Sequence, residues 1–407
     1  MRGECSKRRI DSWIEPTVAA AALFALDDDV ALLEATDGSG RSILAGGRRV
    51  DTAVPRVDLN LTADPAPRFV GWLSYEGAGR WLDVDRSLAF DHETQTMECY
   101  GDSDWHTAVD RVIAEFAGEP VPLPPTSATA VRSSGDPQWR HDDASYLAMI
   151  VACQEAIRRG DAYQLCLTNA ATVADPHDPW TVYLRLRTSS PTHHAGFLRI
   201  GGSTLISASP ERFVEVSADG VVGSSPIKGT RRRDRDPAID DALAVELAAD
   251  PKERAENVMI VDLVRNDLSR VSEVGSVRVT RLLEVERYAQ VHQLVSRVEG
   301  RLREGLAGAD AVESLFPAGS MTGAPKCSAT AILSRLEGER RGTYSGCFGV
   351  IFGDGSVDLA MVIRSVTIEE GIATVGSGGG ITASSRPDAE LDEVHLKAAP
   401  LLAALRS

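Results

Sequence analysis

Apolar residues recur along the chain with two spacings, and each spacing predicts one kind of element. Short runs rich in β-branched and aromatic residues predict strands at residues 30–34, 69–75, 196–200, 204–207 and 213–216. Between residues 143 and 160 the apolar positions fall on one helical face, with Asp143 as the expected N-cap and Gly160 at the end. Further helices are expected at 237–268 and 388–405, and hairpin turns at 353–355 and 370–371.

This order of elements predicts the fold class. Strands come in runs and helices in blocks, which is typical of an α+β fold and not of alternating βαβ units. Residues 119–140 are rich in proline, serine and threonine, and we interpret them as a linker or surface crossover. They divide the chain into a smaller region at 1–118 and a larger region at 141–407.

Composition narrows the class of protein. The 407 residues are 43% hydrophobic and 25% charged, which is typical of a soluble globular protein. The net charge of -16 argues against nucleic acid or an anionic membrane as a partner, so an anionic substrate would need local basic groups or a metal. Six scattered cysteines without a CxxC pair indicate neither a disulfide framework nor a zinc site, and the expected compartment is a reducing cytoplasm. No signal peptide or membrane span is expected.

One lysine lies in an unusual turn, Pro226-Ile227-Lys228-Gly229-Thr230, which three arginines follow at 231–233. A desolvated amine crowded by other cations loses its proton and becomes a nucleophile. The alternative is an ordinary solvated basic turn, which is the more frequent situation for lysine and arginine.

Two pairs of glutamates are spaced three residues apart, Glu253 with Glu256 and Glu390 with Glu393. On helices this spacing puts both members of a pair on one face. Two such faces meeting would form an all-oxygen site suited to Mg²⁺. The alternative is two solvated helix faces, with Glu393 and Lys397 as an ordinary i,i+4 ion pair.

Two further segments could receive an anion. Residues 320–326 lead into a helix with proline at its first position, and such a helix start offers free N–H groups. The glycine run at 376–382 follows a strand and would let the backbone approach a ligand carboxylate closely, although it could also be a generic turn. Arg364, on a probable strand, would need an anionic partner if it faces the interior.

In this order, these segments resemble the chorismate-utilising enzymes of the anthranilate synthase component I family. The resemblance is dense from residue 144 to 405 and fainter near Leu32-Leu33-Glu34 and at 71–77. The matching segments are Gly160-Asp161-Ala162-Tyr163-Gln164, Ser209-Pro210-Glu211-Arg212-Phe213, and residues 226–230, 255–268, 323–326, 378–381 and 390–398.

The resemblance implies two facing β-sheets flanked by helices, with a cleft for Mg²⁺ and chorismate in a chorismate-binding region at 141–407. It implies a metal site at Glu256 and Glu393, with Glu253 and Glu390 beside them. The substrate contacts that it implies are Gln164, Thr322, Tyr344, Arg364, Lys397 and the backbone of Gly378, Gly379 and Gly380.

Three positions discriminate among the family's reactions. Gln164 stands where water-adding members have a lysine base, and an amide cannot take a proton from water. Lys228 stands where anthranilate synthases have alanine, and it resembles the nucleophile of the aminodeoxychorismate synthase component I group. Gln293 departs from the usual histidine, which lies one place earlier here as His292. This departure fits a synthase that retains the enolpyruvyl group, but it could equally disturb substrate positioning.

The expected reaction joins chorismate and ammonia into 4-amino-4-deoxychorismate, for 4-aminobenzoate and folate or for a specialised aromatic amine. Lys228 would add at ring C2 while Glu211, as general acid, protonates the departing C4 hydroxyl. Alternatively, Glu211 could simply pair with Arg212. Two other functions stay open: direct amination at C2, giving anthranilate or 2-amino-2-deoxyisochorismate, and a regulatory subunit that binds chorismate or tryptophan without turnover.

The ammonia source is not recognisable in this sequence. No cysteine lies in a glutaminase-like nucleophile elbow, so the expected partner is a separate glutamine amidotransferase subunit. Residues 32–34 resemble the region where relatives hold tryptophan, whereas Asp37 and Ser39 nearby could equally form a plain hairpin turn.

Overall fold

The computed structural model describes the chain except for residues 1–4, 25–28, 39, 119–134, 289–290 and 407. Most of the predicted linker at 119–140 therefore lies outside the described residues, as does Ser39. The strands are β1 (Ser6–Ile10), β2 (Val30–Glu34), β3 (Arg41–Val50), β4 (Pro67–Leu73), β5 (Gly79–Asp91), β6 (Thr96–Gly101), β7 (Gln138–Trp139), β8 (Gln164–Ala174), β9 (His194–Ile200), β10 (Ser203–Ser209), β11 (Arg212–Val216), β12 (Val221–Ser224), β13 (Ile227–Arg232), β14 (Arg278–Arg287), β15 (Val291–Arg301), β16 (Gly323–Ala324), β17 (Cys347–Phe352), β18 (Val357–Met361), β19 (Ser365–Glu369) and β20 (Ile372–Ile381). The helices are α1 (Pro16–Leu23), α2 (Ser103–Phe116), α3 (Asp143–Arg158), α4 (Pro179–Ser189), α5 (Pro237–Ala249), α6 (Pro251–Ser269), α7 (Gly308–Leu315), the 3-10 turn η1 (Gly319–Met321), α8 (Lys326–Glu337) and α9 (Pro387–Arg406).

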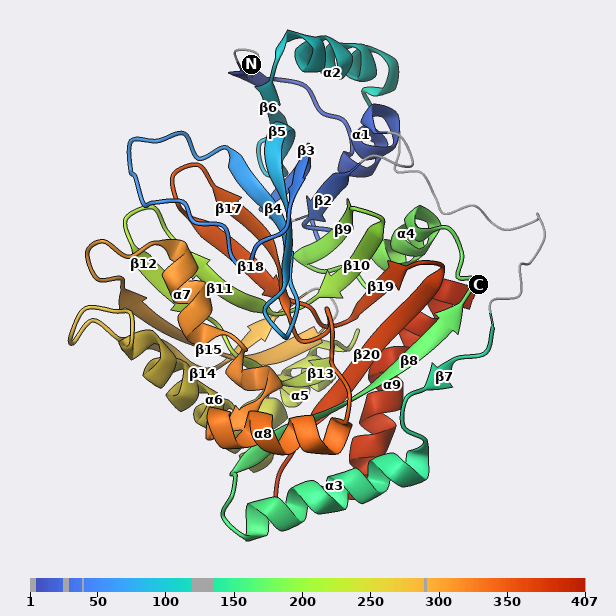
Figure 1. The fold of residues 1–407 in the computed structure, drawn as a ribbon, viewed down its shortest axis with the longest axis vertical. Helices are drawn as coiled ribbons and strands as arrows, with labels where there is room; N and C mark the ends of the chain where they lie inside the picture. Colours follow the sequence, from blue (N-terminus) through green and yellow to red (C-terminus); the bar gives the residue numbers. More distant parts are fainter. Residues whose placement is uncertain (1–4, 25–28, 39, 119–134, 289–290, 407) are drawn as a thin grey trace.

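Within the described residues, the strands form one hydrogen-bonded network of 20 that folds back on itself. One half contains β8, β20, β19, β10 and β9, and the other contains β4, β17, β18, β11, β12 and β15. In Figure 1 the first half lies to the right and β17, β18, β11 and β12 lie to the left. A buried cluster from both halves, including Leu198, Leu205, Trp72 and Phe348, packs between them. The expected two facing layers are therefore confirmed, and hydrogen bonds join them at the β2 and β3 strands.

Strands from the two predicted regions pair with each other. β2 runs antiparallel to β9, and β4 runs antiparallel to β17. The strands before residue 118 thus complete the sheet of the larger region, because each would otherwise leave an unpaired edge.

Helices cover the outer faces of the two halves. α6 and α7 pack on the half that contains β11 and β12, where Ile260, Val264 and Val312 join the buried cluster. α3, α8 and α9 pack on β8 and β20, through residues such as Ile150, Leu333 and Val394. In the described part of the chain, none of the helices is long and apolar enough to cross a lipid bilayer.

Most predicted elements are confirmed, and the exceptions have local causes. α3 is capped by Asp142, whose carboxylate accepts from the Ser145 N–H, and not by Asp143. The expected helical block at 237–268 is two helices, because Asp250 ends α5 and caps α6 before Pro251. The glycine run belongs to strand β20 and not to a loop, since it pairs residue by residue with β8.

Candidate active site

A cavity of about 920 Å³ is lined by residues from both halves of the sheet. Strands β8, β13, β15 and β20, helices α6 and α9, and the turn η1 contribute to its wall. The predicted residues that line it are Glu211, Lys228, Glu253, Glu256, Tyr344, Arg364, Gly378, Gly379, Gly380, Glu390, Glu393 and Lys397. Residues widely separated in sequence therefore meet in one cavity, as the resemblance implied.

Lys228 reaches this cavity from a distorted strand. β13 pairs with β15, but the register shifts between Lys228 and Thr230, which indicates a bulge at Gly229. Gly229 has φ +75°, and a Cβ there would lie 2.7 Å from Leu247 Cδ1. Only glycine fits this conformation and space, and the bulge directs the neighbouring lysine.

The arginines that follow Lys228 in sequence are mostly directed away from its amine. Arg231 Nη2 lies 3.0 Å from Glu246 Oε1, and Arg233 Nε lies 2.8 Å from Asp240 Oδ1. Arg232 is the one of the three that lines the cavity. The expectation that crowding by arginines deprotonates Lys228 is therefore wrong for the ligand-free protein.

Carboxylates surround the Lys228 amine instead. Burial lowers its pKa, but the charges of Glu256, Glu211 and Glu393 raise it, and the net pKa lies above the usual lysine value. The surrounding carboxylates therefore favour the ammonium form of Lys228.

Glu211 faces the same cavity and is separate from Arg212. Burial raises the pKa of Glu211, although Lys228 and a hydrogen bond with Ser320 partly oppose the shift. Arg212 pairs instead with Asp358, at 3.0 Å from Nε to Oδ1. A carboxyl with a raised pKa beside an ammonium is suited to proton transfer.

The two glutamate pairs come from different helices, α6 and α9, as expected. Two lysines contact the pair on α9: Lys252 Nζ lies 3.3 Å from Glu390 Oε1, and Lys397 Nζ lies 2.6 Å from Glu393 Oε1. In the described residues, no three His, Cys, Asp or Glu side chains already gather in metal-binding geometry. One carboxylate oxygen, Glu256 Oε1, is nevertheless buried without a hydrogen-bond partner. Burial raises the pKa of this carboxyl, so a further cation would stabilise its charged form.

At two glycines of β20, other atoms of the protein lie where a Cβ would be. A Cβ on Gly380 would lie 2.3 Å from Gln164 Nε2, and one on Gly378 would lie 2.6 Å from the Leu167 carbonyl oxygen. Lys397 Nζ donates to the Gly378 carbonyl at 2.8 Å. Because glycine has no side chain, backbone atoms form this part of the cavity wall. Backbone N–H and C=O groups can therefore lie close to a ligand.

We expect Gly376→Ala to destabilise the protein by about 1–3 kcal/mol, the usual cost of overpacking. The new Cβ would lie 2.1 Å from Tyr344 Cγ, so the ring must move. Urea unfolding of both proteins measures the effect. Gly135→Ala is the matched control, because nothing lies within 4 Å of its Cβ position, and its stability should change by less than about 0.5 kcal/mol. Equal stabilities of the two variants would contradict the packing argument.

Arg364 lies in the connection between β18 and β19 and not on a strand. Its φ is +51°, and its carbonyl accepts from the Ala208 N–H at 3.1 Å. Burial lowers the pKa of its guanidinium, and the nearby Tyr344 and Glu393 do not reverse the shift. A bound carboxylate would supply the missing negative charge.

Two expected substrate contacts, Thr322 and Gln164, lie behind the cavity wall. Thr322 is fully buried, and its hydroxyl donates to the Ala318 carbonyl at 3.1 Å. Gln164 is 2% exposed and lies beside Gly380, and its Oε1 has no hydrogen-bond partner. The start of α8 is also outside the wall, since Lys326 Nζ binds Asp267 at 2.6 Å.

Sequence reasoning did not single out Lys252 and Cys166, which both line the cavity, whereas Ser320 belongs to the segment expected to receive an anion. Lys252 precedes Glu256 by one helical turn, so the i,i+4 spacing on a predicted helix could have identified their contact. No sequence signal marked Cys166, whose place depends on the pairing of β8 with β20.

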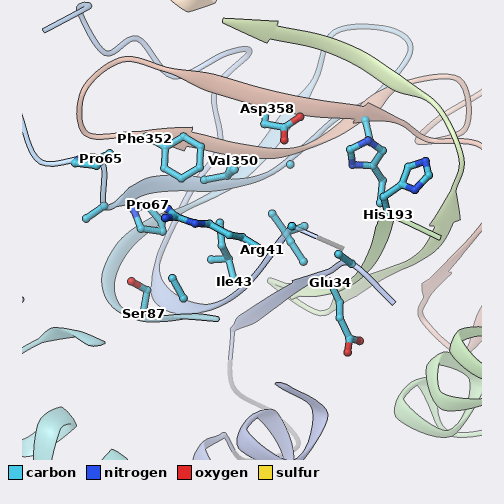
Figure 2. A pocket seen from close by; sticks show the side chains of 18 of the residues that line it. Glu34, Arg41, Ile43, Pro65, Pro67, Ser87, His193, Val350, Phe352 and Asp358 are labelled. Atoms are coloured by element: carbon cyan, nitrogen blue, oxygen red, sulfur yellow. The ribbon is translucent and has the colours of Figure 1, made fainter. Parts of the chain in front are cut away.

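A second cavity of about 290 Å³ lies near β2, β3 and β9, and it includes Leu33 and Glu34 in its lining. Figure 2 shows the Glu34 side chain directed away from Arg41 and Ile43. Its carboxylate is fully buried and binds Arg187 Nη2 at 2.6 Å. Arg41, His193 and Asp358 are among the polar residues that line this cavity.

Comparisons with known proteins agree with this architecture. Residues 24–403 match the chorismate binding enzyme family. The chain is 40% identical to an aminodeoxychorismate synthase of Streptomyces pristinaespiralis, over 91% of this chain and 56% of that protein. It is 35% identical to anthranilate synthase component 1 of Streptomyces coelicolor, over 98% of this chain and 88% of that protein.

A solved structure shows the same fold. Anthranilate synthase component I of Streptococcus pneumoniae superposes with a TM-score of 0.77 at 26% identity, over 96% of this chain and 97% of that one. The chain spans about half the length of the curated aminodeoxychorismate synthases that it matches, 56% and 45% in two cases. By its sequence match and its fold, this chain belongs to the chorismate binding enzyme family.

Proposed function

We propose that this chain is the aminodeoxychorismate synthase component that converts chorismate and ammonia to 4-amino-4-deoxychorismate. The observation that carries the proposal is the presence of Lys228 and Glu211 in one cavity, a lysine amine together with a carboxyl of raised pKa. The relatives named aminodeoxychorismate synthase support it.

The basic groups of the cavity suit a substrate with two carboxylates. Arg364 and Lys397 line the cavity together with the β20 backbone and the glutamates of α6. Charge-assisted hydrogen bonds from these groups would orient chorismate. Tyr344 would bound the ring, because its own ring packs against β20 at Gly376.

Glu256 and Glu393 would hold Mg²⁺, with Glu253 and Glu390 beside them. The unpartnered Glu256 Oε1 fits this assignment, since Mg²⁺ prefers carboxylate oxygens. A bound Mg²⁺ supplies positive charge to the ring carboxylate of the substrate.

We expect Glu256→Gln to raise the Mg²⁺ concentration for half-maximal rate by roughly tenfold or more, because even outer-shell changes at metal sites cost that much. A magnesium titration of the rate measures this shift. Asp262→Asn is the matched control, since Asp262 lies on the same helix but is 79% exposed and pairs with Arg265. If both variants shift the Mg²⁺ requirement equally, the effect comes from the loss of a negative charge and not from the loss of a metal ligand.

Proton transfer between Lys228 and Glu211 would prepare both groups for the reaction. The carboxylates around Lys228 favour its ammonium form, which must lose a proton before it attacks. We infer that the Glu211 carboxylate accepts this proton, since burial favours the neutral acid that results. One transfer then yields a neutral amine and a protonated acid.

The covalent steps balance in atoms and charge. Lys228 Nζ bonds to C2 of chorismate, the ring double bonds shift, and the C4–O bond breaks as Glu211 gives its proton to the departing hydroxyl. Water leaves. Ammonia then bonds to C4, the double bonds return, and the C2–N bond breaks to release the amine of Lys228. The new C4 ammonium returns one proton to Lys228.

Product identity tests the proposal. The purified chain is incubated with chorismate, Mg²⁺ and ammonium at alkaline pH, and the product is identified by mass and by coupling to aminodeoxychorismate lyase. Formation of 4-aminobenzoate in the coupled assay supports the proposal. Anthranilate or 2-amino-2-deoxyisochorismate would contradict it.

Direct amination at C2 is the second candidate function, favoured by the anthranilate synthase relatives. Lys228 opposes it, because that reaction needs no lysine nucleophile. Gln293, which is 5% exposed and lines the cavity, also opposes aromatisation to anthranilate, since an amide cannot remove a proton.

Two binding partners complete the proposal. A separate glutamine amidotransferase would deliver the ammonia, and a pull-down with that subunit followed by glutamine-dependent turnover tests it. Tryptophan would occupy the second cavity near Leu33, with Arg41 and Asp358 as the charged groups for its carboxylate and amine. Calorimetric titration with tryptophan tests that assignment.

We also propose a reducing cytoplasm as the compartment, which suits the free thiols of Cys99, Cys153 and Cys347.

A further inference from the structure

We propose that Lys252 is a displaceable counterion, whose ammonium stands between the two glutamate pairs and must withdraw before a divalent cation binds them. Lys252 would thereby set the metal affinity of the ligand-free site. The inference rests on the proposed metal site, but it concerns a residue with no assigned part in the reaction.

The position of Lys252 bridges the two helices that carry the glutamates. Its Nζ lies 3.3 Å from Glu390 Oε1 on α9 and 3.8 Å from Glu256 Oε1 on its own helix α6. One positive charge thus lies between carboxylates that would otherwise repel each other across the cavity. The ammonium occupies the place that a cation shared by both helices would take.

Lys252 does not satisfy all the carboxylate oxygens around it. At 3.8 Å the contact with Glu256 is too long for a hydrogen bond, and Glu256 Oε1 remains buried without a partner. A divalent cation approaches carboxylate oxygens to about 2.1 Å and would satisfy that oxygen. The carboxylates are therefore better matched to a metal ion than to the ammonium.

Lys252 can also leave at little cost. Its side chain is 49% exposed, whereas the side chains of Glu256 and Glu390 are 9% and 5% exposed. Lys397 differs, because it also donates to the Gly378 carbonyl at 2.8 Å and is 30% exposed. Lys397 therefore has a second anchor, while Lys252 can swing into solvent when the metal arrives.

The test measures Mn²⁺ binding to the whole chain without chorismate, by the loss of the free-ion electron paramagnetic resonance signal. We expect Lys252→Met to bind Mn²⁺ roughly tenfold more tightly than the wild type, because a competing unit charge is removed from a partly exposed site. Lys252→Arg keeps the charge and should bind like the wild type.

A matched control distinguishes competition between Lys252 and the metal ion from the effect of removing any positive charge. Arg254→Met removes one positive charge from the exposed side of the same helix, where the guanidinium contacts only the Ala248 carbonyl among the described residues. Its Mn²⁺ affinity should equal that of the wild type. Circular dichroism confirms that each variant is folded.

Two results overturn the inference, and they differ in meaning. If Lys252→Met binds Mn²⁺ no more tightly than Arg254→Met, while Glu256→Gln loses the ion, the metal site stands and the counterion role of Lys252 fails. If Glu256→Gln binds Mn²⁺ as the wild type does, the metal assignment itself fails, and the inference fails with it.

Discussion

Lys228→Ala is expected to lower the rate of 4-amino-4-deoxychorismate formation by about a thousandfold or more, the usual scale for loss of a covalent nucleophile. The variant keeps the cavity but has no amine to attack C2, so only direct attack by ammonia at C4 remains. Steady-state rates with ammonium as the nitrogen source, measured by the lyase-coupled assay, give the effect.

A second variant distinguishes the loss of the nucleophilic amine from the loss of the positive charge. Lys228→Arg keeps a positive charge near Glu256 and Glu211 but offers no nucleophilic amine, because arginine is not deprotonated in proteins. It should bind chorismate within a few-fold of the wild type and form no product. With ammonia withheld, intact-protein mass spectrometry should detect a covalent adduct on the wild type alone. Wild-type rates in either variant would refute the nucleophile assignment.

Arg341→Met is expected to destabilise the protein by about 3–5 kcal/mol, the range for breaking a buried ion pair from one side. Arg341 is 7% exposed, and it contacts Glu337 through Nε at 2.8 Å and Nη2 at 2.7 Å. It also donates to the carbonyls of Met321 and Cys166, at 2.6 and 2.8 Å. The variant would leave the Glu337 carboxylate buried without its arginine partner, and the carbonyls of Met321 and Cys166 would each lose a donor. Urea unfolding measures the loss.

The same contacts tie Arg341 to the active cavity, because Met321 and Cys166 both line it. We therefore expect Arg341→Met to weaken chorismate binding as well, which a KM measurement on the folded variant would show. The neighbouring Arg340→Met is the control, since Arg340 is exposed and its change should cost less than about 0.5 kcal/mol. If the two variants are equally stable, the buried network does not support the cavity wall.

Local sequence patterns predicted most of the elements, because caps, turns and apolar spacing act over a few residues. Strands β9, β10 and β11 lie where β-branched runs placed them, and the closing helix α9 begins one residue before its predicted start. The misplaced features depended on partners distant in sequence. The glycine run became strand β20 only because β8 pairs along its length. Arg364 lies between two strands because the chain turns back there onto β10, through the Ala208 N–H.

The sequence by itself indicated most of the residues that line the candidate site, because lysine, glutamates and glycines in this order are specific enough to identify the family. It could not determine their charge states. Arg231 and Arg233, close to Lys228 in sequence, pair with α5, whereas Glu256 and Glu393 reach Lys228 only when α6 and α9 pack on the sheet. Electrostatic energies depend on distance in space and on burial, and the tertiary structure alone fixes both.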